Sequence, residues 1–476
     1  MLILENLVAV LPMIVVATTA VVVMLSIAWK RNHGLTAALS AAGLLLALAC
    51  VPLASSALSS PPLITMDGLA IMGTVLVLLC ALVIVALSHH YLIGYIGPKE
   101  EFYLLLLCSV TGALGLVASD HLATLFISLE LLSMPLYGMV AYSFRAERSL
   151  EAGVKYLILS AAATAFMLFG MALIYARTGQ LELGALAAGL AGGPDPWVLG
   201  GAVLILVGLG FKLSIMPFHL WTPDVYQGGV APATLVLATV SKLAVFLVLL
   251  RLMMVAPAFD SEWLRSLITV LALISMLGGN LLALFQRNLK RLLGYSSIAH
   301  IGYLLVAVVV EGPLAVETTG VYLFTYVVTT LAAFGVVIRL SSPFEGEDAA
   351  GLHNYRGLFW RRPWLAAAMT LSLLSLAGIP LTAGFIGKFY VLALGIADAR
   401  WWLVGGIVAG SAIGLFYYLR AMVTLYLPEP SMRHNDVSSD LGSRIGGLTL
   451  MVVGILILVL GAYPSPMIEW IAGLSM

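Results

Sequence analysis

The chain has 476 residues, of which 62% are hydrophobic and only 10% are charged, and its formal net charge is zero. Its mean hydropathy of +1.07 excludes a water-soluble fold, because the polar side chains are too few to cover such a surface. The balanced charge and the absence of a basic or acidic tail exclude nucleic acid as an expected partner.

Apolar runs of about 20 residues recur along the whole chain, and the connections between them are too short for an extramembrane domain. This pattern predicts an all-α polytopic membrane protein with a single transmembrane domain, residues 1–476. The first run, 7–29, is too long for a signal-peptide core and predicts a retained helix without a cleaved leader. About fourteen transmembrane helices are expected, over residues 5–28, 34–56, 68–90, 101–119, 121–141, 153–176, 197–227, 229–252, 263–285, 293–310, 315–338, 364–396, 401–425 and 446–464.

The seventh and twelfth spans, 197–227 and 364–396, are too long for one straight crossing. Each contains an internal proline, Pro217 or Pro380, and therefore predicts a broken helix. The two spans are five helices apart, and an odd offset reverses the orientation in the membrane. The sequence thus predicts two inverted five-helix repeats, helices 4–8 and 9–13, an architecture that places ion sites near the midplane.

Positive charges fall mainly on one side of this arrangement. Of the 23 lysines and arginines, sixteen lie in or near connections that follow odd-numbered helices, four lie opposite and three lie within the membrane. Because cytoplasmic connections carry the excess, both termini are expected on the periplasmic side of a bacterial inner membrane. The sixteen are Lys30, Arg31, Lys99, Arg145, Arg148, Lys155, Arg287, Lys290, Arg291, Arg339, Arg356, Arg361, Arg362, Arg420, Arg433 and Arg444, and the four are Arg177, Arg251, Arg265 and Arg400.

Four ionisable residues lie near the middle of apolar runs: Glu130, Lys212, Lys242 and Lys388. A charge at the centre of a spanning helix costs roughly 2.5 to 3.5 kcal/mol on insertion scales, and such groups mark ion or proton pathways. Glu130 and Lys212 are the expected pair, since a buried lysine changes its protonation readily when a carboxylate approaches or withdraws. His300 is a candidate intermediate carrier, because imidazole loads and unloads protons near neutral pH.

A row of lysines favours protons over alkali cations, because an ammonium group repels Na⁺. Structural alternatives remain open: Glu130 and Lys212 as an ion pair that only specifies packing, and His300 as a hydrogen-bonded core residue. Cys50, Cys80 and Cys108 have no metal-ligand spacing, so neither a disulfide nor an iron–sulfur cluster is expected.

Five motifs resemble one known family. They are SLELLSMPLYGM at 128–139, GVKYLILS at 153–160, GFKLSIMPFHLWTPD at 210–224, SK at 241–242 and GIPLTAGFIGKF at 378–389. In this combination and order they resemble the antiporter-like membrane subunits of respiratory NADH:quinone oxidoreductase (complex I), and the resemblance covers nearly the full chain.

The resemblance implies roles for individual residues. Glu130 and Lys212 would be the coupled pair, Lys242 the central residue and Lys388 the exit-side residue of one proton channel, with His300 in a matching stretch. Partners would be antiporter-like subunit M and small membrane subunits, and NADH, FMN, iron–sulfur clusters and quinone would reside in partner subunits, with no cofactor in this chain. The alternatives are a subunit of an Mrp-type Na⁺/H⁺ antiporter, a membrane-bound hydrogenase subunit, or a scaffold whose buried charges specify assembly.

Overall fold

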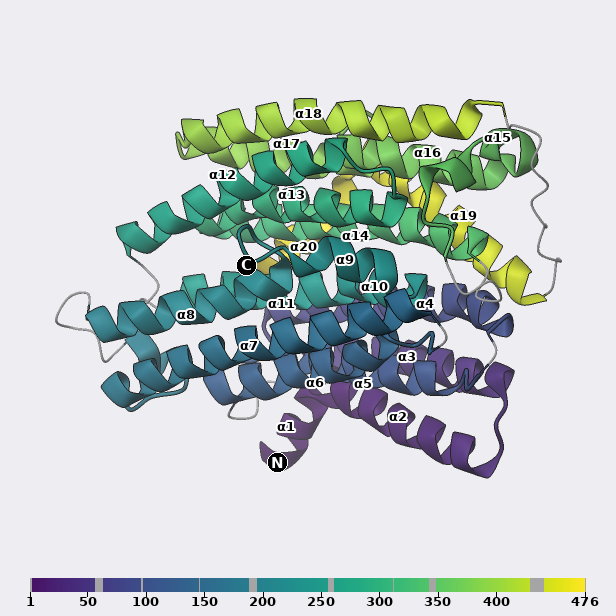
Figure 1. The fold of residues 1–476 in the computed structure, drawn as a ribbon. Coiled ribbons are helices and arrows are strands. Elements are labelled where there is room, and N and C mark those ends of the chain that lie inside the picture. Colours follow the sequence, from purple (N-terminus) through teal and green to yellow (C-terminus); the bar gives the residue numbers. More distant parts are fainter. Residues whose placement is uncertain are drawn as a thin grey trace.

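The computed structural model describes residues 2–55, 63–95, 97–144, 146–187, 195–255, 261–310, 312–341, 348–428 and 441–475. Helices that run roughly alongside one another make up nearly all of this part of the chain (Figure 1). Arg145 and Arg433, two of the sixteen charges assigned to one side, lie outside the described residues.

Twelve helices in the described part of the chain are long and apolar enough to cross a membrane. Together with α5 and the broken helix α16–α17, they match the fourteen predicted spans one to one, so the predicted fold class is confirmed. These helices are α2 (Leu11–Trp29), α3 (His33–Ser55), α4 (Gly68–Ile93), α5 (Glu101–Val117), α6 (Leu122–Val140), α7 (Glu147–Thr178), α8 (Pro196–Leu213), α10 (Ala231–Val236) continuing through η2 (Leu237–Ser241) into α11 (Lys242–Val255), α12 (Glu262–Leu284), α13 (Leu289–Val310), α14 (Pro313–Leu340), α16 (Pro363–Ala377), α17 (Ala383–Ala397), α18 (Trp401–Tyr426) and α19 (Leu441–Ala462).

Six short helices in the described part of the chain were not predicted as separate elements. Two of them, α1 and α20, continue the apolar composition of the neighbouring span, α9 is the second half of the broken span predicted over 197–227, and the others lie in connections. They are α1 (Leu2–Ala9), η1 (Ala185–Ala187), α9 (Trp221–Gly228), η5 (Leu352–Tyr355), α15 (Leu358–Arg361) and α20 (Ser465–Ser475).

The two predicted helix breaks are confirmed, and both use the same local geometry. α8 ends at Ser214, which is left-handed with φ of 64°, and α16 ends at Gly378, with φ of 83°. The N–H of each residue donates back to the last turn of its helix, as in a common helix terminus, and a proline follows within three residues. Each break therefore divides its span into two half-helices, α8 and α9 (Trp221–Gly228) in the first and α16 and α17 in the second.

Corresponding helices pack in corresponding ways in the two halves. In the first half α5 packs along α6, and in the second half α12 packs along α13. The first half occupies the lower part of Figure 1 and the second half the upper part, with α4 and α14 in contact between them. This arrangement agrees with the predicted pair of inverted repeats.

Hydrogen bonds and ion pairs join the connecting segments at the two opposite ends of the helices. One end carries most of the positive charges, and here loops distant in sequence are joined by Arg31 Nη2 to Glu101 Oε1 (2.6 Å), Tyr142 OH to the Pro98 carbonyl (2.8 Å), Lys290 Nζ to Asp348 Oδ2 (2.6 Å) and Arg420 Nη2 to the Gln286 carbonyl (2.9 Å).

The other end is held by Asp67 and Arg251. The Arg251 guanidinium is buried and donates to both Asp67 carboxylate oxygens, at 2.8 and 2.7 Å. The backbone of Leu474, near the C-terminus, packs against Gly68, and Val10, near the N-terminus, shares a small cavity with Ile64. Both termini therefore lie at the end opposite the positive charges.

Replacing Asp67 with alanine is expected to lower the melting temperature of the protein. The change leaves the Arg251 guanidinium without its carboxylate and also removes the cap that Asp67 Oδ1 provides to the Ala70 N–H at the start of α4. Because Asp67 is partly exposed, we expect a loss of about 2 kcal/mol in the free energy of unfolding. Asp67→Asn keeps the cap and should lose less, which thermal unfolding of the purified protein checks; equal loss in both variants would contradict the capping role.

Candidate functional site

The predicted site residues on α8, α11, α13 and α17 are all buried. Relative exposure is 2% for Lys212, 1% for Lys242, 5% for His300 and 9% for Lys388. These lysines therefore do not reach the surface of the chain, and each must be held by groups inside the protein.

Lys212 lies in the last turn of α8, just before the break, and is held by neutral hydroxyl groups. Its Nζ donates to Ser133 Oγ on α6 at 2.6 Å and to Ser160 Oγ on α7 at 2.7 Å. It also lies 5.8 and 5.6 Å from the ring centroids of Tyr137 and Tyr156. Hydroxyls and aromatic faces can hold an ammonium group without supplying a fixed negative charge.

The direct pair expected between Glu130 and Lys212 is not formed in this structure. Glu130 Oε1 instead accepts from Thr164 Oγ1 on α7, at 2.9 Å. Thr164 and Ser160 are four residues apart and so lie on one face of α7. α7 thus supplies one hydroxyl partner to Glu130 and another to Lys212, an arrangement that the sequence did not reveal.

Glu130 itself is only half-buried. It lies on a face of α6 that also carries Ile127 and Met134, which are 64% and 66% exposed. A carboxylate at bilayer depth that is partly exposed on the chain must be covered by protein or water in the membrane. This face of α6 is therefore suited to contact another membrane subunit.

Lys242 is the first residue of α11 and directly follows η2, a single π-helical turn over Leu237–Ser241. Such turns shift the register of a helix and occur often at functional sites. The Lys242 Nζ donates to Ser297 Oγ on α13, at 2.8 Å, and Ser297 donates in turn to the Gly294 carbonyl at 2.7 Å. This lysine, too, has a neutral partner.

His300 lies on α13, close to Ser297, and both of its ring nitrogens are engaged. Nδ1 is 2.7 Å from Tyr322 OH on α14 and Nε2 is 3.3 Å from Tyr418 OH on α18. Tyr418 is also hydrogen-bonded to Ser296. A cavity of about 10 Å³, roughly the room for one water molecule, adjoins the imidazole between α14 and the α16–α17 break.

Lys388 lies on α17, after the second break. Its Nζ donates to the Ala377 carbonyl at 2.9 Å, and it lies 5.3 Å from the ring centroid of Tyr303. The stem of the lysine runs across Gly378, where a Cβ atom would come within 2.7 Å of its Cδ. Glycine at this position thus satisfies both the positive φ and the close approach of Lys388.

The two lysines of the broken helices occupy equivalent places even though one precedes its proline and the other follows it. Lys212 lies in the last turn of α8, and the Lys388 side chain folds back onto the last residue of α16. Lys212 thus comes from the end of its first half-helix, and the Lys388 amine returns to the end of its own. This correspondence supports the inverted repeat and depends on the tertiary fold, so the order of residues in the chain did not indicate it.

A buried amide of the second half was also absent from the predicted site residues. Asn280 on α12 is buried, donates to Tyr303 OH and accepts from Tyr417 OH, both at 2.9 Å. Tyr303 in turn lies against Lys388, so Asn280 positions a ring of this site. An amide in the middle of the apolar run 263–285 was the signal that could have identified it.

No cluster of three or more His, Cys, Asp or Glu side chains that could hold a metal ion occurs within the described ranges. The site in this part of the chain consists of amines, hydroxyls, an imidazole and one carboxylate. Such groups exchange protons, and they provide no ligand set typical of a redox centre.

The helices, the two breaks and the buried amines define a polytopic membrane protein of the ion-translocating class. A family model described as NADH:quinone oxidoreductase/Mrp antiporter, transmembrane, matches residues 119–414. The chain belongs to this family.

Two curated relatives are similar over nearly their whole length, and both are named NADH-quinone oxidoreductase subunit N. The one from Chromohalobacter salexigens is 60% identical over 98% of both chains. The one from Ectopseudomonas mendocina is 54% identical over 98% of this chain and 96% of the relative. The expected resemblance to the antiporter-like subunits of NADH:quinone oxidoreductase is thus confirmed.

Comparison with solved structures supports the same family. A chain of respiratory complex I from Thermus thermophilus matches with a TM-score of 0.82 and 34% identity, over 96% of this chain and 98% of that one. The Mrp complex from Dietzia matches with a TM-score of 0.85 but only 20% identity, over 99% of this chain and 97% of that one. The second likeness extends to the fold alone.

Proposed function

We propose that this chain, as a membrane subunit of an NADH:quinone oxidoreductase, moves protons across the bacterial inner membrane through Glu130, Lys212, Lys242, His300 and Lys388. The observation that supports this proposal is that Lys212, Lys242 and Lys388 are each held by hydroxyl or carbonyl groups and not by a carboxylate. An amine with neutral partners can lose its proton without leaving a buried anion behind.

The route runs laterally through the two halves. In the first half, Glu130 and Lys212 each contact a hydroxyl of α7; in the second, Ser297, His300 and the tyrosines around it lie between Lys242 and Lys388. Protons would pass along hydroxyls, imidazole and internal water. Residues 1–476 would act as one unit, since the row draws on helices of both repeats.

The energy for transport comes from outside the chain. Moving one charge against 100 mV costs about 2.3 kcal/mol, and we assign the NADH, FMN, iron–sulfur and quinone chemistry that supplies it to partner subunits. The half-buried Glu130 on an apolar face of α6 supports a neighbouring membrane subunit there, subunit M or one of the small subunits. The charge distribution supports a periplasmic position for both termini.

Lys242→Ala in the intact enzyme tests this proposal. The ratio of protons pumped to NADH oxidised should fall sharply in inverted membrane vesicles, because the amine between the two halves is gone, while the amount of assembled enzyme stays normal. Leu243→Met, a volume-conserving change in the next residue, is the matched control. Full pumping with normal assembly would defeat the relay, and failed assembly of the Lys242→Ala enzyme alone would favour the scaffold alternative.

A further inference from the structure

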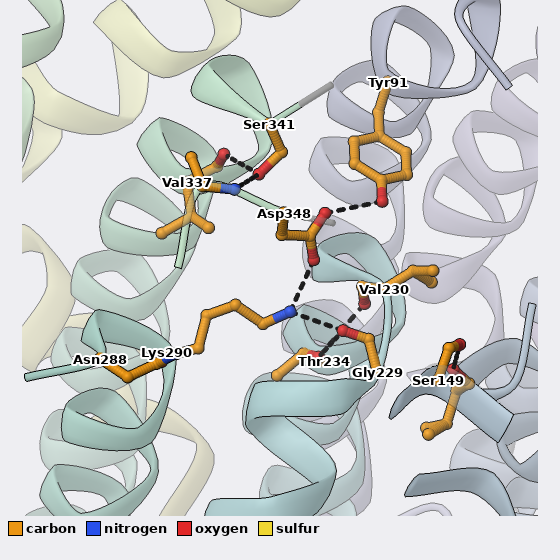
Figure 2. Close-up of polar contacts among 12 residues, drawn as sticks. Tyr91, Ser149, Gly229, Val230, Thr234, Asn288, Lys290, Val337, Ser341 and Asp348 are labelled. Carbon is orange, nitrogen blue, oxygen red and sulfur yellow. Dashed lines mark hydrogen bonds and ion pairs between the residues drawn. The ribbon is translucent and has the colours of Figure 1, made fainter. Parts of the chain in front are cut away.

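A second buried charge cluster lies away from the lysine row, at the positively charged end of the helices. Lys290 on α13 is 1% exposed and its Nζ donates to Asp348 Oδ2 and to the Gly229 carbonyl, both at 2.6 Å (Figure 2). Tyr91 OH on α4 donates to the other Asp348 oxygen, at 2.7 Å. The sequence indicated only that Lys290 helps to set topology, and the proton relay described above does not use this cluster.

The three side chains of the cluster line a cavity. The cavity has a volume of about 250 Å³ and lies between α4, α7, α9, α13 and the segment that follows α14. It reaches the surface beside Arg148 and His353, which are exposed, and its wall includes Ser143. A space of this size with polar walls accommodates several water molecules.

α13 connects this cavity to the lysine row. Lys290, Gly294 and Ser297 follow one another at spacings of four and three residues and therefore lie along one face of the helix. We call these three residues the α13 stripe. From Lys290 to Ser297 it covers roughly 10 Å at 1.5 Å per residue. Ser297 accepts a hydrogen bond from Lys242, so the stripe leads from the cavity to that lysine.

Tyr226 fills the middle of the stripe. Its ring lies against Gly294, where an added Cβ would come within 3.4 Å of it. Its hydroxyl is buried and lies close to Ser297. A polar atom of this kind between two buried amines can take part in a water-linked path.

We propose that this cavity is the proton entrance of the subunit and that Asp348 and Lys290 pass protons from it along α13 to Lys242. This inference rests on the proposed function and adds the place where protons are taken up. Asp348 accepts a proton from cavity water; Lys290, which contacts both Asp348 and the Gly229 carbonyl, then gives its own proton inward and regains one from Asp348. Each transfer moves a proton only, so the charges balance and both groups return to their starting state.

The test uses a cysteine at the mouth of the cavity in the intact enzyme. Ser143→Cys is treated, in inverted membrane vesicles, with a membrane-impermeant methanethiosulfonate that carries a trimethylammonium group. A fixed positive charge at this mouth should lower the ratio of protons pumped to NADH oxidised by about tenfold at low salt, and a thiol reductant should restore it. Glu147→Cys, on an exposed neighbour outside the cavity wall, is the matched control and should pump normally when labelled. Unsubstituted enzyme treated in parallel accounts for native cysteines.

Two results would overturn the inference: an S143C enzyme that cannot be labelled, because the cavity would then be closed to water, or a fully labelled one that pumps like the control. Asp348→Asn provides a second test. If Asp348 passes protons, this variant should lower the ratio of protons pumped to NADH oxidised by the enzyme that does assemble. If the ion pair is only structural, less enzyme assembles but the ratio for the assembled enzyme stays unchanged. If Lys242→Ala stops pumping while the labelled S143C enzyme pumps normally, only the entrance is wrong. If Lys242→Ala pumps normally, the proposed function itself fails.

Discussion

Lys212→Met is expected to remove proton transport through this subunit while leaving the melting temperature unchanged or higher. The ammonium group is buried against hydroxyl groups and two tyrosine rings, without a carboxylate partner. Replacing it by an apolar side chain therefore removes the cost of burying a charge and leaves no unpaired anion beside it. Both serines keep a partner after the substitution, since Ser133 donates to the Leu129 carbonyl and Ser160 is hydrogen-bonded to Tyr137. No orphaned polar group is created, so the usual cost of removing one partner does not arise.

Two measurements on one purified enzyme check this expectation: thermal unfolding, and the ratio of protons pumped to NADH oxidised after reconstitution. Leu206→Met, another buried position of α8, is the matched control and should leave both unchanged. A Lys212→Met enzyme that melts at a clearly lower temperature but pumps normally would show that the lysine is there for stability. A residue that costs stability and is needed for activity has the signature of a functional site.

Gly112→Ala is expected to prevent accumulation of the assembled protein. Gly112 on α5 lies so close to α6 that an added Cβ would be 2.3 Å from the Leu132 nitrogen, and a backbone atom cannot move aside as a flexible side chain can. Overpacking costs about 1–3 kcal/mol where neighbours can adjust and more where they cannot. Leu132 lies between Glu130 and Ser133, so any displacement of α6 also disturbs the partners of Lys212.

Gly405→Ala provides a control in the same protein. Gly405 lies within α18, and a Cβ atom there would meet nothing within 4 Å. This variant should accumulate at least as well as the unsubstituted chain, because alanine is the better helix former by about 1 kcal/mol. Native gels measure the amount of assembled enzyme for both variants. Equal amounts for Gly112→Ala and Gly405→Ala would contradict the close packing of α5 on α6.

The sequence predicted the spans and the candidate amines because the membrane makes both conspicuous. A run of about 20 apolar residues rarely occurs outside a membrane span, and a lysine in the centre of such a run rarely occurs without a function. The breaks at Pro217 and Pro380 were predicted from the same apolar runs, which were too long for one crossing. The site partners were not predictable in this way, since Ser133, Ser160 and Ser297 are hydroxyl residues of a kind that is common in membrane helices.

Other features depend on tertiary structure alone. The π-helical turn before Lys242 has no distinctive residues, because it is a one-residue shift in hydrogen bonding within an ordinary apolar stretch. Asp348 lies in a polar connection, and nothing local distinguishes it from a solvent-exposed acid. Only the fold brings it to Lys290, 58 residues earlier, and buries the two together.

The breaks in the two long helices have an electrostatic consequence. A helix that stops inside the protein exposes the partial negative charge of its carboxyl end, equivalent to roughly half an electron charge, in a region where water cannot screen it. Lys388 places its ammonium group directly on the Ala377 carbonyl at such an end, and Lys212 lies in the last turn of α8. The backbone dipoles of α8 and α16 can therefore stand in for counter-ions, which explains how a chain with a single acid at mid-membrane tolerates three lysines there.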